Sequence, residues 1–163
     1  MSLLALPWDA RVLAAALQHG GGRLYVAGKT DERTTDCSRL AYATLLKLYG
    51  SRVESERAAL MLWKGQGPWS PPEAVQRLGL GKLVVVPQPG CWHLVQGWVS
   101  TTPLSGGHAF LWYEPMAPLA AGTGVQVQGN KALGSFVEDG QTFAEQIARY
   151  KGGVRIAVLH EES

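Results

Sequence analysis

The chain has 163 residues, of which 46% are hydrophobic and 17% charged, and its formal net charge is +2. This length and composition favour one domain with a core of its own, covering residues 1–163, and exclude a disordered chain. The charges nearly balance, and no run of like charges is longer than two residues. The sequence therefore has no basic patch that would indicate nucleic-acid binding, and it gives little support to membrane binding.

The N-terminal stretch MSLLALPWDARVLAAALQHGGG predicts a first helix over about residues 7–19, ended by the glycines that follow it. It lacks a basic start and a small-residue cleavage site, and Asp9 and Arg11 interrupt its apolar region, which is not typical of a signal peptide. No apolar stretch in the chain approaches the roughly 18 residues of a membrane span. Cys37 and Cys91 give no disulfide framework and indicate a reducing compartment. We therefore expect synthesis in the cytoplasm without a signal peptide.

Helical patterns fill the first half of the chain and strand patterns the second half. After a short extended segment, RLYVAG, and a polar loop, helices are expected over residues 37–49, in VESERAALMLW and from the SPPE motif onward. From Gly81 the segments KLVVVP, HLVQGWVS, HAFLWYE and VQVQGN predict strands, followed by a short helix, TFAEQIARY, and a last strand, VRIAVLH. A capping box is expected at Thr142 and Glu145. This order predicts an α+β domain built on an antiparallel sheet.

Cys37 stands at the start of the second helix, directly after Asp36. Apolar or small residues follow it at helical spacings on its own face: Leu40, Ala41, Thr44, Leu45 and Leu48. The first turn of a helix presents unpaired N–H groups and the positive end of the helix dipole, which favour a thiolate and can hold the oxyanion of an acyl-transfer intermediate. The alternative is a buried cysteine that packs as a small hydrophobe.

A catalytic thiol needs a base, and His108 opens the strand HAFLWYE directly after SGG. Alternation places His108, Phe110 and Trp112 on one face of the sheet. The next predicted strand presents three amides on one of its own faces, and one of them could accept a hydrogen bond from the imidazole and fix its tautomer: Gln126, Gln128 and Asn130. The alternatives are a structural histidine and a solvated strand face.

The stretch YVAGKTDERTTDCSRLAYATLLKLYG, residues 25–50, resembles the nucleophile region of the NlpC-type papain-like cysteine peptidases. GGHAFLWYE resembles the second signature of that family, in which a histidine begins an apolar strand, and it lies 71 positions after Cys37 (108 − 37). The turn QPG before a strand resembles the Pro-Gly-Asp turn often found between the two. The nucleophile region matches the family in register and without a gap at seven positions: Tyr25, Val26, Gly28, Asp36, Cys37, Ser38 and Leu40.

The resemblance implies a papain-like fold, in which N-terminal helices, including the nucleophile helix, pack on a C-terminal antiparallel sheet. It makes Cys37 the nucleophile and His108 the general base and acid, with the third polar residue expected at Asn130 first and Gln128 second. It also implies a group that binds substrate or supports the oxyanion at the helix start: Tyr25, Asp36, Ser38 and Arg39. The implied reaction is hydrolysis of amide bonds in peptidoglycan stem peptides or other γ-glutamyl peptides, next to D-glutamate, through a thioester acyl-enzyme and without metal or cofactor.

Departures from the family pattern keep other functions open. Arg39 stands where the family commonly has glycine, Ala27 where it has tryptophan, and Lys29 where it has a second glycine. One alternative is a papain-like deamidase, transglutaminase or lipid acyltransferase. Another is a non-catalytic module of a phage or secretion assembly, with an assembly or immunity protein as partner. Delivery by a secretion machine, in a virion or by lysis also remains open. Cys91 and His93 lack the second ligand pair that a zinc site needs.

Overall fold

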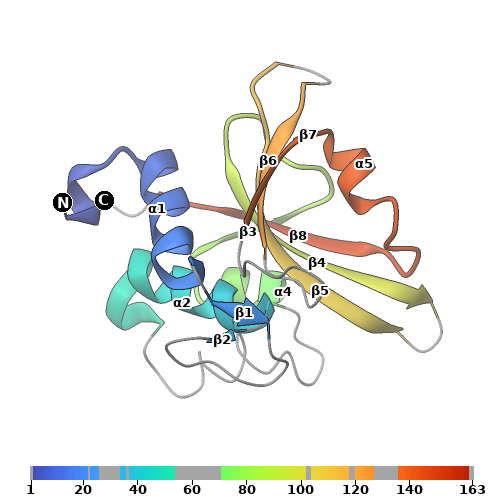
Figure 1. Ribbon diagram of the computed structural model, residues 1–163, viewed down its shortest axis with the longest axis horizontal. Helices are drawn as coiled ribbons and strands as arrows, with labels where there is room; N and C mark the ends of the chain where they lie inside the picture. Colours follow the sequence, from blue (N-terminus) through green and yellow to red (C-terminus); the bar gives the residue numbers. More distant parts are fainter. Residues whose placement is uncertain are drawn as a thin grey trace.

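The computed structural model describes residues 2–21, 23–25, 34–35, 37–53, 71–101, 104–117, 120–126 and 136–161 (Figure 1). The helical elements are η1 (Leu3–Ala5), α1 (Trp8–Gly20), α2 (Cys37–Tyr49), η2 (Gly50–Arg52), α4 (Pro71–Arg77) and α5 (Phe143–Ile147). The strands are β1 (Leu24–Tyr25), β2 (Thr34–Thr35), β3 (Gly81–Val84), β4 (Trp92–Thr101), β5 (Leu104–Tyr113), β6 (Gly122–Gln126), β7 (Phe136–Gln141) and β8 (Val154–Leu159).

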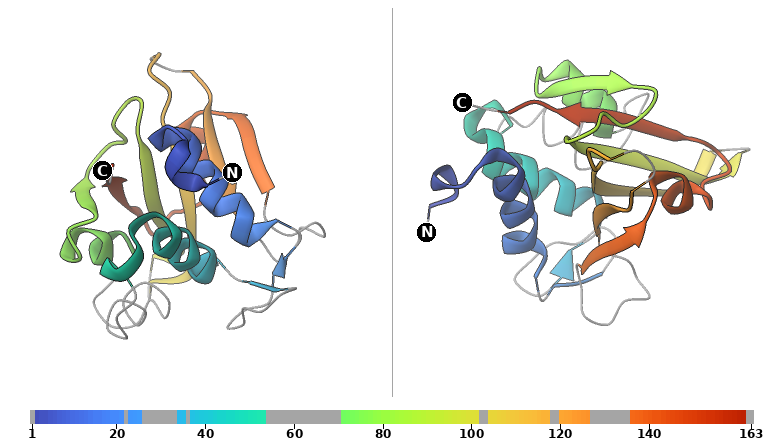
Figure 2. Two further views of the ribbon diagram at one scale, coloured as in Figure 1. Left: turned by 90° about the vertical axis from the view of Figure 1, so that its left-hand side faces the viewer. Right: turned by 90° about the horizontal axis from the view of Figure 1, so that it is seen from above.

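Six strands form one antiparallel sheet in the order β3-β8-β4-β5-β6-β7, which confirms the predicted α+β class and the antiparallel sheet. The short strands β1 and β2 form a separate parallel pair. The helices α1 and α2 contact each other and lie together on one side of the sheet, whereas α5 lies on the other (Figures 1 and 2). Along the described part of the chain, no helix combines the length and apolar character needed to cross a membrane.

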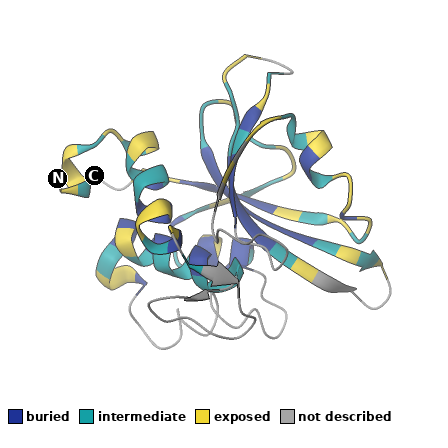
Figure 3. Cartoon of the chain, in the orientation of Figure 1, coloured by how far each residue is buried: buried dark blue, intermediate teal, exposed yellow. Residues whose placement is uncertain are grey.

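The sheet separates two apolar clusters, because successive side chains of a strand point to opposite faces. On one face, Leu94, Leu111 and Val125 pack with α1, α2 and α4 in the larger cluster. On the opposite face, Phe110 and Trp112 pack in a smaller cluster formed around α5 and the turn that follows it. Figure 3 shows the buried residues concentrated along the middle of the sheet and on the helix surfaces that face it. Neighbouring residues of β5 therefore have quite different surroundings.

Helix α2 begins at Cys37 and ends at Tyr49, as its apolar periodicity predicts. Its inward face is buried over the predicted positions: Leu40, Ala41, Thr44, Leu45 and Leu48. The following residue, Gly50, has a φ of +58°, a conformation that glycine adopts without steric cost. The Tyr49 hydroxyl lies 2.8 Å from the carbonyl oxygen of His160, so the end of the helix is tied to the segment after β8.

Some elements differ from the sequence-based expectations. Strand β7 was not predicted, and β6 begins at Gly122, before the predicted segment VQVQGN. A β-carbon at Gly122 would lie 2.3 Å from the Trp112 ring, so β6 needs glycine there to approach β5. The capping box at Thr142 and Glu145 is confirmed, with both of its hydrogen bonds formed. The helix predicted in VESERAALMLW covers residues 53–63. Val53 lies in a turn, and the other residues of this segment are outside the described ones.

Candidate active site

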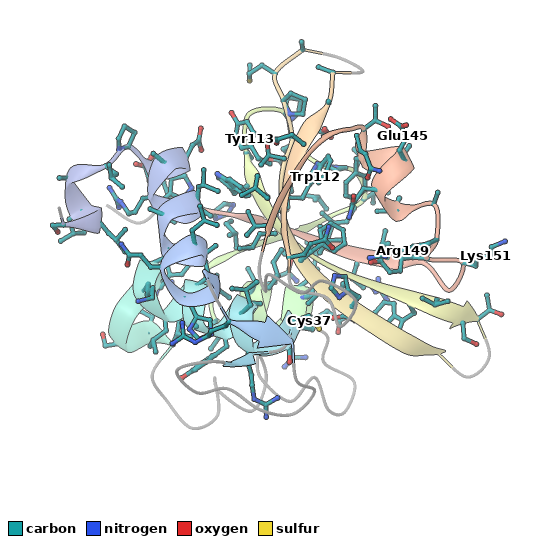
Figure 4. All side chains as sticks on the ribbon, viewed as in Figure 1. Cys37, Trp112, Tyr113, Glu145, Arg149 and Lys151 are labelled. Carbon is teal, nitrogen blue, oxygen red and sulfur yellow. The ribbon has the colours of Figure 1, made fainter. Side chains whose placement is uncertain are left out.

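Cys37 is the first residue of α2, and its side chain is partly buried. Helix α2 contacts β5, the strand that carries His108, and Figure 4 shows Cys37 at the end of the helix near this strand. Ser38 and Arg39 follow in the first turn and are also partly buried. Asp36 lies outside the described residues, and Tyr25 is described only as backbone in β1. The helix therefore begins at Cys37, as its sequence pattern predicts.

His108 forms a side-chain hydrogen bond with Gln126, with 2.9 Å between Nε2 and Oε1. A carbonyl oxygen can only accept, so Nε2 carries the proton and Nδ1 keeps its lone pair. Burial lowers the pKa of His108 to about 4, with a smaller lowering by the charge of Arg149, while the bond to Gln126 acts in the opposite direction. The imidazole is therefore neutral at pH 7, with a fixed tautomer and Nδ1 as its basic nitrogen.

The amide that bonds the imidazole among the described residues is that of Gln126, the third of the three candidates. Asn130 and Gln128, the two residues favoured from the sequence, lie outside the described residues, and their role stays a prediction. The register pairs Leu111 with Val125, so Gln126 lies one step further along β6 on the face shared by His108. Diagonal neighbours across two strands are within reach of long side chains. Sequence alternation identified the face that carries the amides, but it could not fix the register that selects Gln126.

The His108 ring lies on the face of the sheet opposite to the one on which α2 packs. It stacks on Phe110 and Tyr150, with ring centroids 5.9 and 6.4 Å apart. His108 pairs with Gly97 of β4. A β-carbon added at Gly97 would lie 2.5 Å from the Tyr150 ring, so His108 and Gly97 both lie on the face of the sheet that Tyr150 covers. The described contacts of His108 do not include Cys37. The structure therefore shows a hydrogen bond between His108 and Gln126. Contact between the Cys37 thiol and the His108 imidazole stays a prediction.

Tyr150 and Arg149 are neighbours of His108 that sequence reasoning missed. Tyr150 is buried, and Arg149 is exposed beside it on the turn after α5. The Arg149 guanidinium lies 4.9 Å from the centre of the Tyr150 ring, and its Nη2 donates to the Tyr150 hydroxyl over 2.6 Å. The sequence signal was weak, because the pair follows a short helix and has no motif that links it to the histidine strand.

The second histidine of the sheet, His93, is structural. It is fully buried on β4, accepts a hydrogen bond from the backbone N–H of Gln88 over 2.8 Å, and lies 3.3 Å from the Trp112 carbonyl oxygen through Nδ1. Burial lowers the pKa of His93 to about 4. The neighbouring thiol of Cys91 is not activated, because burial and the charge of Asp9 raise its pKa.

The candidate residues therefore form two groups. Cys37 stands at the start of α2 on one face of the sheet, and the bonded pair His108 and Gln126, with Tyr150 and Arg149 beside it, lies on the other face. Among the described residues, no group of three or more His, Cys, Asp or Glu side chains is placed to hold a metal ion. Comparisons of the chain with protein-family models, with curated proteins and with solved structures find no match.

Proposed function

We propose that this protein is a cysteine hydrolase with a papain-like fold, and that it cleaves amide bonds of peptidoglycan stem peptides next to D-glutamate. The observation that supports this most is the hydrogen bond from His108 to Gln126, because it leaves Nδ1 with a free lone pair in a fixed orientation. Cys37 adds a thiol at the start of a helix that contacts the same strand. The substrate class comes from the family resemblance of residues 25–50.

In the proposed reaction, His108 Nδ1 takes the proton of the Cys37 thiol, and the thiolate attacks the amide carbon. N–H groups at the start of α2 stabilise the oxyanion of the tetrahedral intermediate. The intermediate collapses to a thioester as the C–N bond breaks, and His108 returns the proton to the leaving amine. Water, deprotonated by His108, then attacks the thioester and releases the carboxylic acid and the free thiol.

This mechanism requires the imidazole to reach the thiol, whereas the described ring stacks on Phe110 and Tyr150. The ring also lies on the face of the sheet opposite to α2, and His108 pairs with Gly97 in the ladder between β4 and β5. The proposal therefore requires this part of β5 to change its pairing so that Nδ1 reaches Cys37. An independent measure of coupling between these two residues is the sharpest test of the mechanism.

The first experiment incubates purified peptidoglycan with wild type and with the Cys37→Ala, His108→Ala and Cys91→Ala variants, and identifies released fragments by mass spectrometry. Wild type and Cys91→Ala are expected to release the same fragments, and the other two variants none. The fragment masses identify the bond that is cleaved. Release by Cys37→Ala at the wild-type rate would refute the cysteine mechanism.

The second experiment measures alkylation of Cys37 by iodoacetamide as a function of pH, in a Cys91→Ala background so that one thiol reacts. Coupling predicts that His108→Ala shifts the pH at which Cys37 becomes reactive. The matched control is His93→Phe, which changes a buried histidine of the neighbouring strand and should leave this pH unchanged. An identical profile with and without His108 would show that the imidazole is not the partner of the thiol.

A non-catalytic role is the second candidate, and the stacking of His108 on Phe110 and Tyr150 is the observation that favours it. A histidine enclosed in this way can simply be part of the apolar cluster on that face of the sheet. This function predicts no fragments from any variant and a slowly reacting Cys37.

A further inference from the structure

A cavity of about 320 Å³ lies at the end of the sheet where β4 begins and β5 ends. Its walls come from residues 87 and 89 before β4, residues 114–117 and 120 after β5, and residues 142–144 at the start of α5. Small-molecule sites in proteins usually occupy about 300–1,000 Å³. The lining includes none of Cys37, His108 and Gln126, so the cavity is separate from the candidate active site.

The walls of this cavity are mostly apolar, and hydrogen bonds hold two of them together. The N–H of Gly90 donates to the Glu114 carbonyl over 2.7 Å, and the N–H of Glu114 donates to the Cys91 carbonyl over 3.1 Å. A β-carbon added at Gly90 would lie 2.5 Å from Met116 Sδ, so the methionine packs directly on this backbone. Met116 is nevertheless 72% exposed, and a ligand that covers it would bury apolar surface. The larger apolar residues of the lining are Pro87, Pro89, Pro115, Met116 and Phe143.

Glu114 is the only charged residue that lines the cavity. It is partly buried and forms no ion pair within the described part of the chain. Burial raises the pKa of Glu114, whereas the indole N–H of Trp112 acts in the opposite direction. That N–H is itself buried and has no hydrogen bond of good geometry among the described residues. The ionised carboxylate is therefore poorly solvated, and a bound cation would stabilise it.

We infer that this cavity binds a small organic cation, a primary ammonium group on a compact apolar body. An ammonium group has three N–H donors and no acceptor, so it pairs with the Glu114 carboxylate. It can also donate to the Thr142 hydroxyl, which accepts one hydrogen bond from the Glu145 N–H and keeps a second lone pair. The apolar body packs against the proline rings, Met116 and Phe143. An anion is disfavoured, because Glu145 adds a second negative charge on α5 beside the lining (Figure 4).

The binding test compares 2-phenylethylammonium chloride with 2-phenylethanol, in which a neutral hydroxyl replaces the ammonium group on the same body. The chain has three methionines, so labelling their methyl groups with ¹³C gives a simple NMR spectrum in which Met116→Leu identifies the signal of Met116. Millimolar amine is expected to shift this signal and to bind about tenfold more tightly than the alcohol.

Two substitutions test the two parts of the ligand, each with a matched control. Glu114→Gln should weaken amine binding about tenfold and change alcohol binding less than about twofold. Its control is Glu145→Gln, which removes a carboxylate outside the lining and keeps the capping box, since glutamine also serves at that position. Ala144→Leu should fill the cavity and abolish binding of both compounds. Ala148→Leu, at an exposed alanine of the same segment outside the lining, should leave both affinities unchanged.

Three results would overturn the inference: no shift of the Met116 signal, equal binding of amine and alcohol, or an unchanged amine affinity in Glu114→Gln. Loss of amine binding in Asp9→Asn would also overturn it, by placing the cation in another cavity, of about 590 Å³, lined by Asp9 and Glu161. Tighter binding of Nα-acetyl-lysine methylamide than of the amine would assign the cavity to a lysine side chain of a polypeptide and overturn the small ligand. None of these measurements needs hydrolysis, so a failure to cleave peptidoglycan leaves the inference intact.

Discussion

The pair formed by His108 and Gln126 allows a prediction that does not depend on the identity of the substrate. Gln126→Leu removes the acceptor of the Nε2 proton and keeps a side chain of similar volume. Gln126 is fully buried and lies 2.9 Å from the partly buried imidazole, so water is poorly placed to replace it. A buried donor without a partner costs about 1–3 kcal/mol. We therefore expect the free energy of unfolding to fall by about 1–3 kcal/mol.

The same hydrogen bond also affects the pKa of His108, and two substitutions of Gln126 should shift this pKa in opposite directions. Gln126→Leu removes a bond that raises the pKa of His108, so that pKa should fall further below about 4. Gln126→Glu places a carboxylate beside the ring. A nearby opposite charge favours the protonated imidazole, so the pKa of His108 should rise by about 1–3 pH units. Urea denaturation gives the stability change, and an NMR pH titration of the histidine rings gives both pKa values.

The control for these two variants is Gln96→Leu. Gln96 is a buried glutamine of the neighbouring strand β4, and its amide donates to the backbone carbonyl of Gly97 over 3.3 Å. It should leave the pKa of His108 unchanged. If Gln126→Glu also leaves that pKa unchanged, the hydrogen bond does not exist in solution, and the argument that it fixes the tautomer fails.

Three further predictions concern the fold. Gly97→Ala should lower the free energy of unfolding by about 1–3 kcal/mol, since its methyl group would lie 2.5 Å from the Tyr150 ring; urea denaturation at wild-type stability would contradict this. Tyr49→Phe should cost about 0.5–1.5 kcal/mol because it removes the hydroxyl next to the His160 carbonyl, and thermal unfolding tests it. The pKa values of His93 and His108 are lowered from 6.5 to about 4, so the unfolded chain binds more protons between these values and stability should fall as pH drops through this window. Denaturation at pH 7 and pH 5 measures the loss, and equal stabilities would be inconsistent with burial of the two rings.

The sequence was sufficient to predict helices and strands that a single local pattern of residues marks clearly. Helix α2 has a continuous apolar stripe and is followed by Gly50, so both of its ends were predicted correctly. Strand β7 was missed because an edge strand is only half covered and its sequence, FVEDGQ, contains charged residues and a glycine. The start of β6 was missed for a related reason, since Gly122 and Gly124 resemble a turn. Gly122 is required by the Trp112 ring that packs across it, a contact between strands that no local pattern contains.

The same distinction applies to the candidate site. Alternation correctly placed His108 with Phe110 and Trp112 on one face, because that follows from strand geometry alone. Which face meets α2 depends on how the helices pack on the sheet, and the structure puts His108 on the other one. The contact between Gln126 and His108 depends on strand register in the same way.

The position of β8 in the sheet has a consequence for the order in which the chain can fold. Strands β4, β5, β6 and β7 each pair with a neighbour close in sequence, so they can assemble while the chain is still being synthesised. Strand β3 is made before all of them, yet its partner in the sheet is β8, which also pairs with β4. A nascent chain therefore exposes one edge of β4 to other nascent chains until residues 154–159 leave the ribosome. Synthesis of this last strand is the event that joins β3 to the sheet and ends the period in which that edge can aggregate.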